Sequence, residues 1–209
     1  MMFIFAHGWG FDAHFWDPVI DELSLPNDTE ILKLDFGYTG HSIDIRTQQN
    51  LICVGHSLGC LWLLKHIKHP KAFIAINGFD CFFRHTHKVK IQKMRRNLER
   101  NPDAQMRGFY DACGVNKQTS DLPNDINWNA DELKTGLHWL ETWDQSAERE
   151  QLLCPVKAIC SKDDQIISDA ASSQIWKSTD LIFSDFGGHV LPLTRPRWCT
   201  EHIKNVIDN

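Results

Sequence analysis

The sequence has no apolar run long enough to cross a membrane, and its His and Cys spacings form no ligand set for a metal ion. Basic residues are not in excess, because 22 Lys and Arg stand against 27 Asp and Glu, a net charge of -5 in 209 residues. This balance argues against general nucleic-acid affinity. The chain also lacks internal repeats and low-complexity segments, so we expect one compact domain with room for an insertion.

Disulfide-type cysteine spacing is missing as well. The seven cysteines form an odd set without a Cys-x-x-Cys pair, and most have apolar neighbours, which is typical of a reducing compartment. The six residues before His7-Gly8 are too few and carry too little positive charge for a signal peptide. We therefore expect a cytoplasmic protein, a monomer or weak dimer, with no metal, no other cofactor, no nucleic acid and no membrane as partner.

Tyrosine is scarce, with two residues, whereas the chain holds eight tryptophans and twelve phenylalanines. Two interpretations of this aromatic excess stay open at this point. The side chains fill the core, or they line an apolar pocket for an acyl chain.

Short apolar runs bounded by turn residues recur along the chain, and none alternates cleanly between apolar and polar. Such runs indicate strands of a parallel sheet that is buried on both faces. They lie at 3–6, 31–36, 51–54, 73–76, 156–160 and 181–183. Helix-like stretches at 16–23, 58–68 and 168–177 separate several of them, which predicts an α/β fold.

The succession of strand-like and helix-like segments breaks between residues 80 and 150, where the sequence is polar, helix-prone and free of strand-like runs. We interpret 80–150 as a helical cap inserted into an α/β core formed by 1–79 and 151–209. Residues 84–107 carry eight Lys and Arg against two acidic residues, a net charge of +6. Residues 108–150 carry three against nine, a net charge of −6, so the cap has a basic half and an acidic half.

One short motif carries chemistry. Gly55-His56-Ser57-Leu58-Gly59 follows a predicted strand and precedes an amphipathic run. Gly-x-Ser-x-Gly between a strand and a helix is the nucleophile elbow, in which the serine sits on a strained turn and the glycines let neighbouring backbone pass closely. Ser57 is therefore the candidate nucleophile.

A serine hydroxyl needs a base, and the base needs a carboxylate that orients it, in the chain order Ser, Asp, His. His189 lies on a glycine-bearing loop after the last predicted strand, which makes it the candidate base. Asp163 and Asp164 both follow the run 156–160 and compete for the orienting role. The pattern Asp164-Gln165-Ile166-Ile167-Ser168 favours Asp164 and leaves Asp163 as a solvated turn residue.

The tetrahedral intermediate of such a reaction needs hydrogen-bond donors for its oxyanion. His7-Gly8-Trp9-Gly10 follows the first predicted strand, and its glycines let the backbone turn an N–H toward the serine. We assign the oxyanion hole to the N–H groups of Trp9 and Leu58 and expect His7 to prop the loop.

Together these residues resemble the α/β-hydrolase superfamily over nearly the whole chain. The HGWG start with a Phe-Trp pair after it, the helical insertion and Cys154-Pro155 are similar to the BioH-type pimeloyl-acyl-carrier-protein methyl ester esterases of biotin synthesis. The resemblance implies a mostly parallel sheet flanked by helices, with an inserted helical cap. No strand pair precedes Phe3, so we expect about six strands, with the N-terminal strands of the superfamily missing.

The resemblance implies roles for further residues. A cap segment would line the acyl-binding site, and it aligns with Phe109, Tyr110, Asp111, Ala112 and Cys113. The site is completed by Trp9, Ser57, Leu58 and His189. Basic cap residues would contact an acidic acyl-carrier protein, and the candidates are Arg95, Arg96, Arg100 and Arg107. The basic stretch 84–107 fits that contact independently, because complementary charge raises the encounter rate, although a solvated basic helix is the alternative.

The expected activity is hydrolysis of a carboxylic ester through an acyl-enzyme, and the resemblance implies the methyl ester of pimeloyl-acyl-carrier protein as substrate. A general carboxylesterase or a thioesterase of small acyl substrates is the alternative within this class, and a non-catalytic hydrolase-like binding protein is the alternative from another class.

One residue beside the elbow departs from the pattern of the superfamily. Cys60 stands where a further glycine is common and is expected to crowd the helix against the sheet.

Overall fold

A six-stranded parallel sheet forms the centre of the molecule in the computed structural model, which describes residues 2–26, 28–40, 42–43, 50–115 and 127–207. The strands follow the order β2-β1-β5-β6-β7-β8, and every neighbouring pair is parallel. Their bounds are Met2–Ala6 (β1), Glu30–Lys33 (β2), Leu51–His56 (β5), Ala72–Ile76 (β6), Val156–Ser161 (β7) and Asp180–Ser184 (β8). The expected sheet of about six strands is confirmed.

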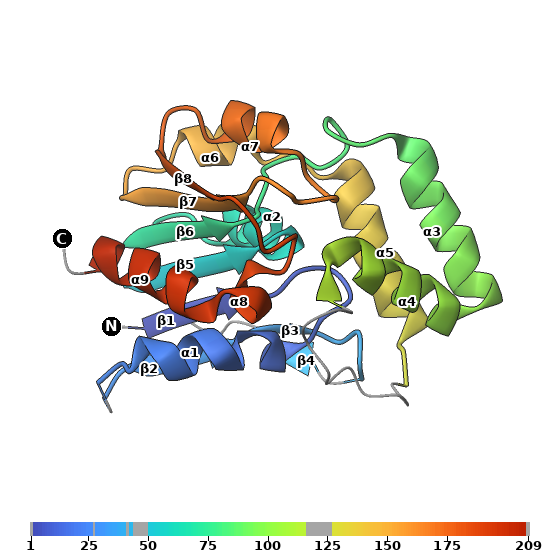
Figure 1. The fold of residues 1–209 in the computed structure, drawn as a ribbon, viewed down its shortest axis with the longest axis horizontal. Coiled ribbons are helices and arrows are strands. Elements are labelled where there is room, and N and C mark those ends of the chain that lie inside the picture. The colour runs from blue at the N-terminus through green and yellow to red at the C-terminus, as the bar shows by residue number, and fades with distance from the viewer. Residues whose placement is uncertain (1, 27, 41, 44–49, 116–126, 208–209) are drawn as a thin grey trace.

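Helices cover both faces of this sheet (Figure 1), which explains why apolar and polar residues do not alternate along its strands. On one face α1 (Asp17–Leu23) packs against α9 (Pro196–Ile207), which also contacts β6 and β7. On the other face α2 (Leu58–His66) lies against β1 and β5, and residues 58–64 are all buried. Two shorter helices, α7 (Asp169–Ile175) and α8 (Leu191–Thr194), complete the core. A 3₁₀ turn, Ala13–Trp16, precedes α1.

The run 31–36, expected as one strand, is divided in the structure, and this part of the prediction is wrong. Strand β2 ends at Lys33, and Asp35–Phe36 (β3) pairs antiparallel with Ser42–Ile43 (β4) in a separate small sheet. The chain turns after Leu34, whose N–H still donates to Phe5 O at 2.8 Å. The Asp35 carboxylate then accepts the N–H of Gly37 at 3.0 Å and stabilises the turn. Between Gly40 and Leu51 the sequence leaves too few residues for a full crossover helix, and 41 and 44–49 in this stretch lie outside the described residues.

Three helices stand at the side of the sheet, at the carboxyl ends of its strands (Figure 1). They are α3 (Lys88–Arg100), α4 (Pro102–Cys113) and α5 (Ala130–Thr142). Asn101 and Asn129 begin α4 and α5, because their side-chain oxygens accept the N–H groups of Ala104 and Glu132. A short helix, α6 (Ser146–Glu150), lies beside α2 of the core. The division of the chain at residues 80 and 150 stays a prediction, and 116–126 lie outside the described part.

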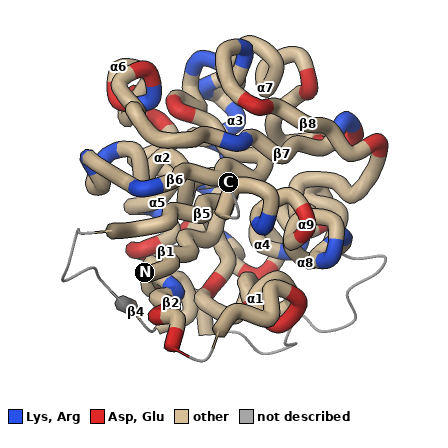
Figure 2. The backbone as a smooth tube through the Cα atoms, turned by 90° about the vertical axis from the view of Figure 1, so that its left-hand side faces the viewer, with Lys and Arg blue, Asp and Glu red and all other residues tan. Residues whose placement is uncertain are grey.

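Ion pairs join the basic and acidic halves of the 80–150 stretch. Arg84 binds Asp144 at 2.5 Å, and Arg95 on α3 binds Glu141 on α5 at 2.9 Å. Opposite charges along the chain are therefore partly neutralised where the helices pack. Strand β1 and the end of α9 lie at the far end of the molecule from α3 (Figure 1), and α1 nearby carries acidic residues, coloured red in Figure 2. No helix in the described ranges is both long and apolar enough to span a bilayer.

The crowding expected from Cys60 is relieved by a glycine at the end of the next strand. A Cβ built on Gly78 would lie 2.1 Å from the Cys60 sulfur and 2.8 Å from its Cβ. The thiol instead donates to Gly55 O at 3.0 Å, within the elbow motif. The Cys60 side chain therefore occupies the space that a side chain at position 78 would need, so the two residues are matched in size.

We expect Gly78→Ala to lower the free energy of unfolding by about 2 kcal/mol, because overpacking a filled core forces side chains and backbone apart. The exchange Cys60→Gly with Gly78→Ala should recover most of that loss. Urea unfolding of both variants and of wild type measures the difference, with Gly108→Ala as control, since a Cβ at Gly108 meets no heavy atom within 4 Å. A double variant no more stable than Gly78→Ala would contradict the pairing.

Candidate active site

Ser57 occupies a strained turn between β5 and α2. Its backbone has φ 53° and ψ −121°, a left-handed conformation that is rare for a residue with a side chain. The flanking glycines allow this turn, because a Cβ on Gly59 would lie 2.0 Å from Ala6 O and a Cβ on Gly55 would lie 2.8 Å from the Cys60 backbone. The motif therefore folds as an elbow that presents the serine at the carboxyl edge of the sheet.

The structure brings Ser57, His189 and Asp164 into one hydrogen-bonded chain. His189 Nε2 lies 2.9 Å from Ser57 Oγ, and His189 Nδ1 lies 2.7 Å from Asp164 Oδ2. An ionised carboxylate only accepts hydrogen bonds, so Nδ1 carries the proton and Nε2 is left to accept the serine O–H. The side chains of His189 and Asp164 are 1% and 0% exposed, so the hydrogen bond between them is shielded from water.

Asp164 is itself held in place by the backbone. Its second oxygen, Oδ1, accepts the N–H groups of Ile166 at 2.7 Å and Ile167 at 3.1 Å. One oxygen of the carboxylate thus anchors the side chain, while the other orients the imidazole. This division of roles is possible because β7 ends at Ser161 and the following residues turn back over its end.

Asp163 lies exposed in a turn, as predicted from the sequence, and its carboxylate also makes hydrogen bonds that the sequence did not indicate. Its carboxylate accepts the N–H of Gly188 at 2.8 Å and of Gly187 at 3.3 Å, and the Ser161 hydroxyl at 2.5 Å. Burial raises the pKa of Asp163, but these three hydrogen bonds outweigh it and hold that pKa below its ordinary value. Asp163 therefore fastens the loop that carries His189, while Asp164 contacts the imidazole.

Asn77 and His56, whose roles could not be predicted from sequence, hold the backbone of His189. Asn77, at the end of β6, donates from Nδ2 to the carbonyls of Gly188 at 3.0 Å and His189 at 2.8 Å. Its Oδ1 accepts Ser161 N–H at 2.9 Å, which ties the end of β7 to the same side chain. His56 Nε2 lies 2.8 Å from His189 O and is the donor, since a carbonyl only accepts. Burial lowers the pKa of His56 well below its ordinary value, so its ring is neutral.

The loop after β1 brings Trp9 to the same site. Its indole donates to Leu133 O on α5 at 2.7 Å, in a space left by Gly136, whose Cβ would lie 2.6 Å from the Trp9 ring. His7 props this loop, because it binds Gly8 O through Nδ1 at 2.8 Å and accepts Phe36 N–H through Nε2. The backbone N–H groups of Trp9 and Leu58 have no acceptor among the described residues, so both donors are available to a ligand. Leu58 is the first residue of α2, where backbone N–H groups have no partner within the helix.

A small pocket of about 90 Å³ opens above Ser57 and is walled mostly by apolar side chains. Of the substrate-binding residues predicted from sequence, it includes Trp9, Ser57 and Phe109. The sequence missed the other apolar walls, which are Phe79, Phe82, Ile91, Met94, Leu137, Leu140 and Ile166. A cluster of Phe residues directly after β6 was the available signal, because the carboxyl ends of parallel strands surround ligands in such sheets.

The remaining residues of the predicted segment 109–113 have other surroundings. The Tyr110 hydroxyl donates to Gly10 O at 2.5 Å and so ties α4 to the first loop. Cys113 O accepts His189 N–H at 3.1 Å, so α4 ends on the backbone of the candidate base. Burial, with a smaller effect of Asp164, raises the pKa of the Cys113 thiol well above its ordinary value, so it stays protonated. Ala112 and Asp111 line neighbouring hollows.

The predicted carrier-contact arginines differ in their surroundings. Arg95 is taken up by its ion pair with Glu141. Arg96, Arg100 and Arg107 are exposed, and none has a carboxylate within ion-pair distance in the part of the chain that is described. Within the same part, no group of three or more His, Cys, Asp or Glu side chains is placed to hold a metal ion.

The comparisons with known proteins concern the fold. No protein-family model matches the sequence, and no curated protein matches it. An esterase from Exiguobacterium antarcticum superposes with a TM-score of 0.80 at 14% identity, over 100% of this chain and 92% of that one. A bromoperoxidase from Bacillus anthracis gives 0.82 at 13% identity, over 100% and 92%. A lipase-esterase related protein from Clostridium acetobutylicum gives 0.74 at 20% identity, over 98% and 93%.

These structures share the architecture of the chain, so the protein has the α/β-hydrolase fold. In this fold ligands bind at the carboxyl ends of the strands, which is where Ser57, Asp164 and His189 lie. The fold hosts several chemistries, so the reaction has to be argued from the site itself.

We expect replacement of Asn77 to loosen the His189 loop. Asn77→Ala should lower the free energy of unfolding by about 1–3 kcal/mol, because buried carbonyl and N–H groups lose their partner. Asn77 has φ 44°, so Asn77→Gly separates lost hydrogen bonds from added backbone strain. Urea unfolding should show a clear loss for both variants, whereas Asn97→Ala, which removes a half-buried hydrogen bond to Gln105, should lose less. A neutral Asn77→Gly would contradict the role of the side chain.

Proposed function

We propose that this protein is a serine hydrolase that cleaves carboxylic esters through an acyl-enzyme. One observation carries the proposal: Ser57 Oγ, His189 and Asp164 form a buried chain of hydrogen bonds at 2.9 and 2.7 Å, with the serine on a strained elbow beside an apolar pocket. The solved structures that share the fold include proteins described as esterases, which is consistent with the proposed ester hydrolysis.

The first half-reaction forms the acyl-enzyme. Ser57 Oγ attacks the ester carbonyl as its proton passes to His189 Nε2, and the Asp164 carboxylate stabilises the imidazolium that results. The N–H groups of Trp9 and Leu58 donate to the oxyanion of the tetrahedral intermediate. When the intermediate collapses, the C–O bond to the alcohol breaks and the alcohol leaves with the proton from His189.

The second half-reaction releases the acid. A water molecule attacks the acyl carbonyl, its proton passes to His189 Nε2, and the same two N–H groups stabilise the second intermediate. The bond from carbonyl carbon to Ser57 Oγ then breaks, and the serine takes the proton back. The hydrogen bonds from Asn77 and His56 to the His189 carbonyl keep the imidazole in the same position through both half-reactions.

The pocket supports an acyl group of modest size as substrate. Its walls are apolar at Phe79, Met94, Leu137 and Phe109, so an aliphatic chain next to the ester bond gains from burial there. A thioester would react by the same route, because the attack and the oxyanion are the same. The aromatic excess in the composition thus has uses in both the core and the pocket wall.

Hydrolysis of p-nitrophenyl butyrate should depend on Ser57 and on Asp164. We expect Ser57→Ala to lower kcat/KM by about 10⁴-fold or more, and Asp164→Asn by about 10²- to 10⁴-fold, because the imidazole loses its orienting acceptor. Asp163→Ala, which affects the loop and not the imidazole, should lose less than about tenfold. Initial rates measured at pH 8 provide the comparison.

A fluorophosphonate probe separates the enzyme from a non-catalytic binding protein of the same fold. Ser57 should be labelled in wild type and Ser57→Ala should not be labelled at all. Absence of labelling together with absence of ester hydrolysis would overturn the proposed function, and equal losses for Asp163→Ala and Asp164→Asn would overturn the assignment of the orienting carboxylate.

We further propose, as the finer form of this function, that the physiological substrate is the methyl ester of pimeloyl-acyl-carrier protein. The support is the sequence resemblance, together with exposed Arg96, Arg100 and Arg107 on α3 and α4 without carboxylate partners among the described residues. An acidic carrier protein is complementary to this surface, and such attraction between exposed charges weakens as salt is added.

Binding of acyl-carrier protein should fall about tenfold between 50 and 500 mM NaCl, and Arg96→Glu with Arg107→Glu should weaken it at low salt. Lys177→Glu, an exposed charge reversal away from α3 and α4, is the matched control. Surface plasmon resonance measures the affinities. Binding that ignores both salt and the double reversal would overturn the carrier-protein proposal and leave a general carboxylesterase.

A further inference from the structure

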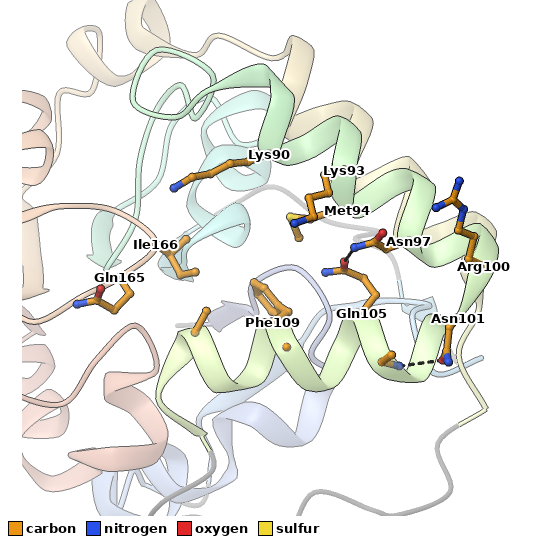
Figure 3. Close-up of a pocket in the computed structure, with 13 residues that line it drawn as sticks. Lys90, Lys93, Met94, Asn97, Arg100, Asn101, Gln105, Phe109, Gln165 and Ile166 are labelled. Carbon is orange, nitrogen blue, oxygen red and sulfur yellow. Dashed lines mark hydrogen bonds between the residues drawn. The ribbon is translucent and has the colours of Figure 1, made fainter.

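A long groove of about 680 Å³ runs between α3 and α4 and joins the pocket above Ser57 (Figure 3). The two hollows share five lining residues, which are Lys90, Met94, Phe109, Gln165 and Ile166. Figure 3 shows Met94 and Lys93 of α3 facing Phe109 and Gln105 of α4 across the groove, with Arg100 at the end far from the core. A chain that leaves the Ser57 pocket past Phe109 therefore enters this groove.

Helical spacing explains why the groove is open. Lys90, Lys93, Asn97 and Arg100 recur at intervals of three and four, which places them on one face of α3. The facing side of α4 carries the short residues Ala104, Gly108 and Ala112 at intervals of four. A Cβ added at Gly108 would meet no heavy atom within 4 Å, so space is left where two helices would otherwise interdigitate.

The charge of the groove is of one sign. Lys90, Lys93 and Arg100 line it, and none of its lining residues is acidic. In the described part of the chain none of these three cations has a carboxylate within ion-pair distance, in contrast to Arg95 on the same helix, which binds Glu141. The amides of Asn97 and Gln105 are occupied with one another, Nδ2 to Oε1 at 3.0 Å. The three cations are the charged groups that the groove offers to a ligand.

We propose that the groove binds the remote, anionic end of an elongated ester substrate, a carboxylate or a phosphate separated from the scissile bond by an aliphatic stretch. The aliphatic stretch would pass between Met94 and Phe109, and the anion would lie along Lys93 and Arg100. This inference rests on the proposed ester hydrolysis, but it concerns the substrate itself and holds with or without a carrier protein. Lys93 and Arg100 are then specificity-determining residues.

The geometry calls for an extended aliphatic chain of about twelve carbons or more. Lys90 lies where the groove meets the Ser57 pocket, and Arg100 lies ten residues further along α3, about 15 Å at the rise of a helix. Short esters would occupy only the inner pocket and gain nothing from the cations. Arginine suits a carboxylate or a phosphate at the outer end because its planar guanidinium can donate two parallel hydrogen bonds.

Matched substrates test this selectivity in the full-length protein. The p-nitrophenyl half-ester of tetradecanedioic acid ends in a carboxylate, and p-nitrophenyl tetradecanoate has the same number of carbons without a charge. A third ester of the same length ending in phosphate distinguishes the two anions. We expect wild type to prefer an anionic ester by about tenfold in kcat/KM, and 500 mM NaCl to narrow the preference.

Charge reversal identifies the cations that select the anion. We expect Lys93→Glu and Arg100→Glu each to reduce the ratio of kcat/KM for the anionic ester over the neutral one by about fivefold, as for the loss of an exposed ion pair. Lys88→Glu, an exposed position on α3 that lines neither hollow, is the matched control and should keep the wild-type ratio. Gly108→Trp should fill the groove and lower kcat/KM for long esters relative to p-nitrophenyl acetate, whereas Gly108→Ala should not.

The outcomes separate the two proposals. Equal hydrolysis of the charged and neutral tetradecanoate-length esters by wild type, or a preference that survives both reversals, would overturn the role of the groove and leave the esterase intact. Failure of wild type on every ester, p-nitrophenyl acetate included, would overturn the proposed function and this inference with it. Thermal unfolding of each variant checks that changes in the ratio come from folded protein.

Discussion

The close approach of α2 to the end of β1 is the constraint on which the rest of the site depends. Only a residue without a side chain fits at Gly59, because a Cβ there would lie 2.0 Å from Ala6 O. This contact sets the first turn of α2 against the segment that leads to Trp9, and it fixes the turn in which Ser57 has φ 53°. One packing contact between a helix and a strand therefore sets the positions of the candidate nucleophile and of the backbone N–H groups of Trp9 and Leu58.

The backbone of the histidine loop is held from four described elements at once. Asn77 reaches it from the end of β6, His56 from the end of β5, Asp163 from the turn after β7, and Cys113 O from the end of α4. A loop would otherwise carry a catalytic group with too much freedom for catalysis. These contacts hold the loop in a fixed position, so the proposed reaction would require little reorganisation of the imidazole.

Much of the fold and the centre of the site could be predicted from sequence because both are encoded locally. Apolar runs without alternation mark the strands, and the Ser57 motif joins a strand to a helix within a few residues. Asn77 and Asp163 were missed because their partners lie 112 and 25 residues away in the chain, and nothing in their neighbours reports those contacts. The break after Leu34 was missed for a related reason, since apolar character continues through Phe36 while the backbone leaves the sheet.

The hydrogen bond from His189 N–H to Cys113 O has a consequence for how this chain can change. Helix α4 lines the groove along its length and supports the candidate base at its last residue. Replacement of the predicted cap, residues 80–150, by that of another protein would remove the support together with the groove. Under the proposed function, one helix therefore couples the binding of a substrate to the alignment of the base, and changes to that helix are best made one side chain at a time.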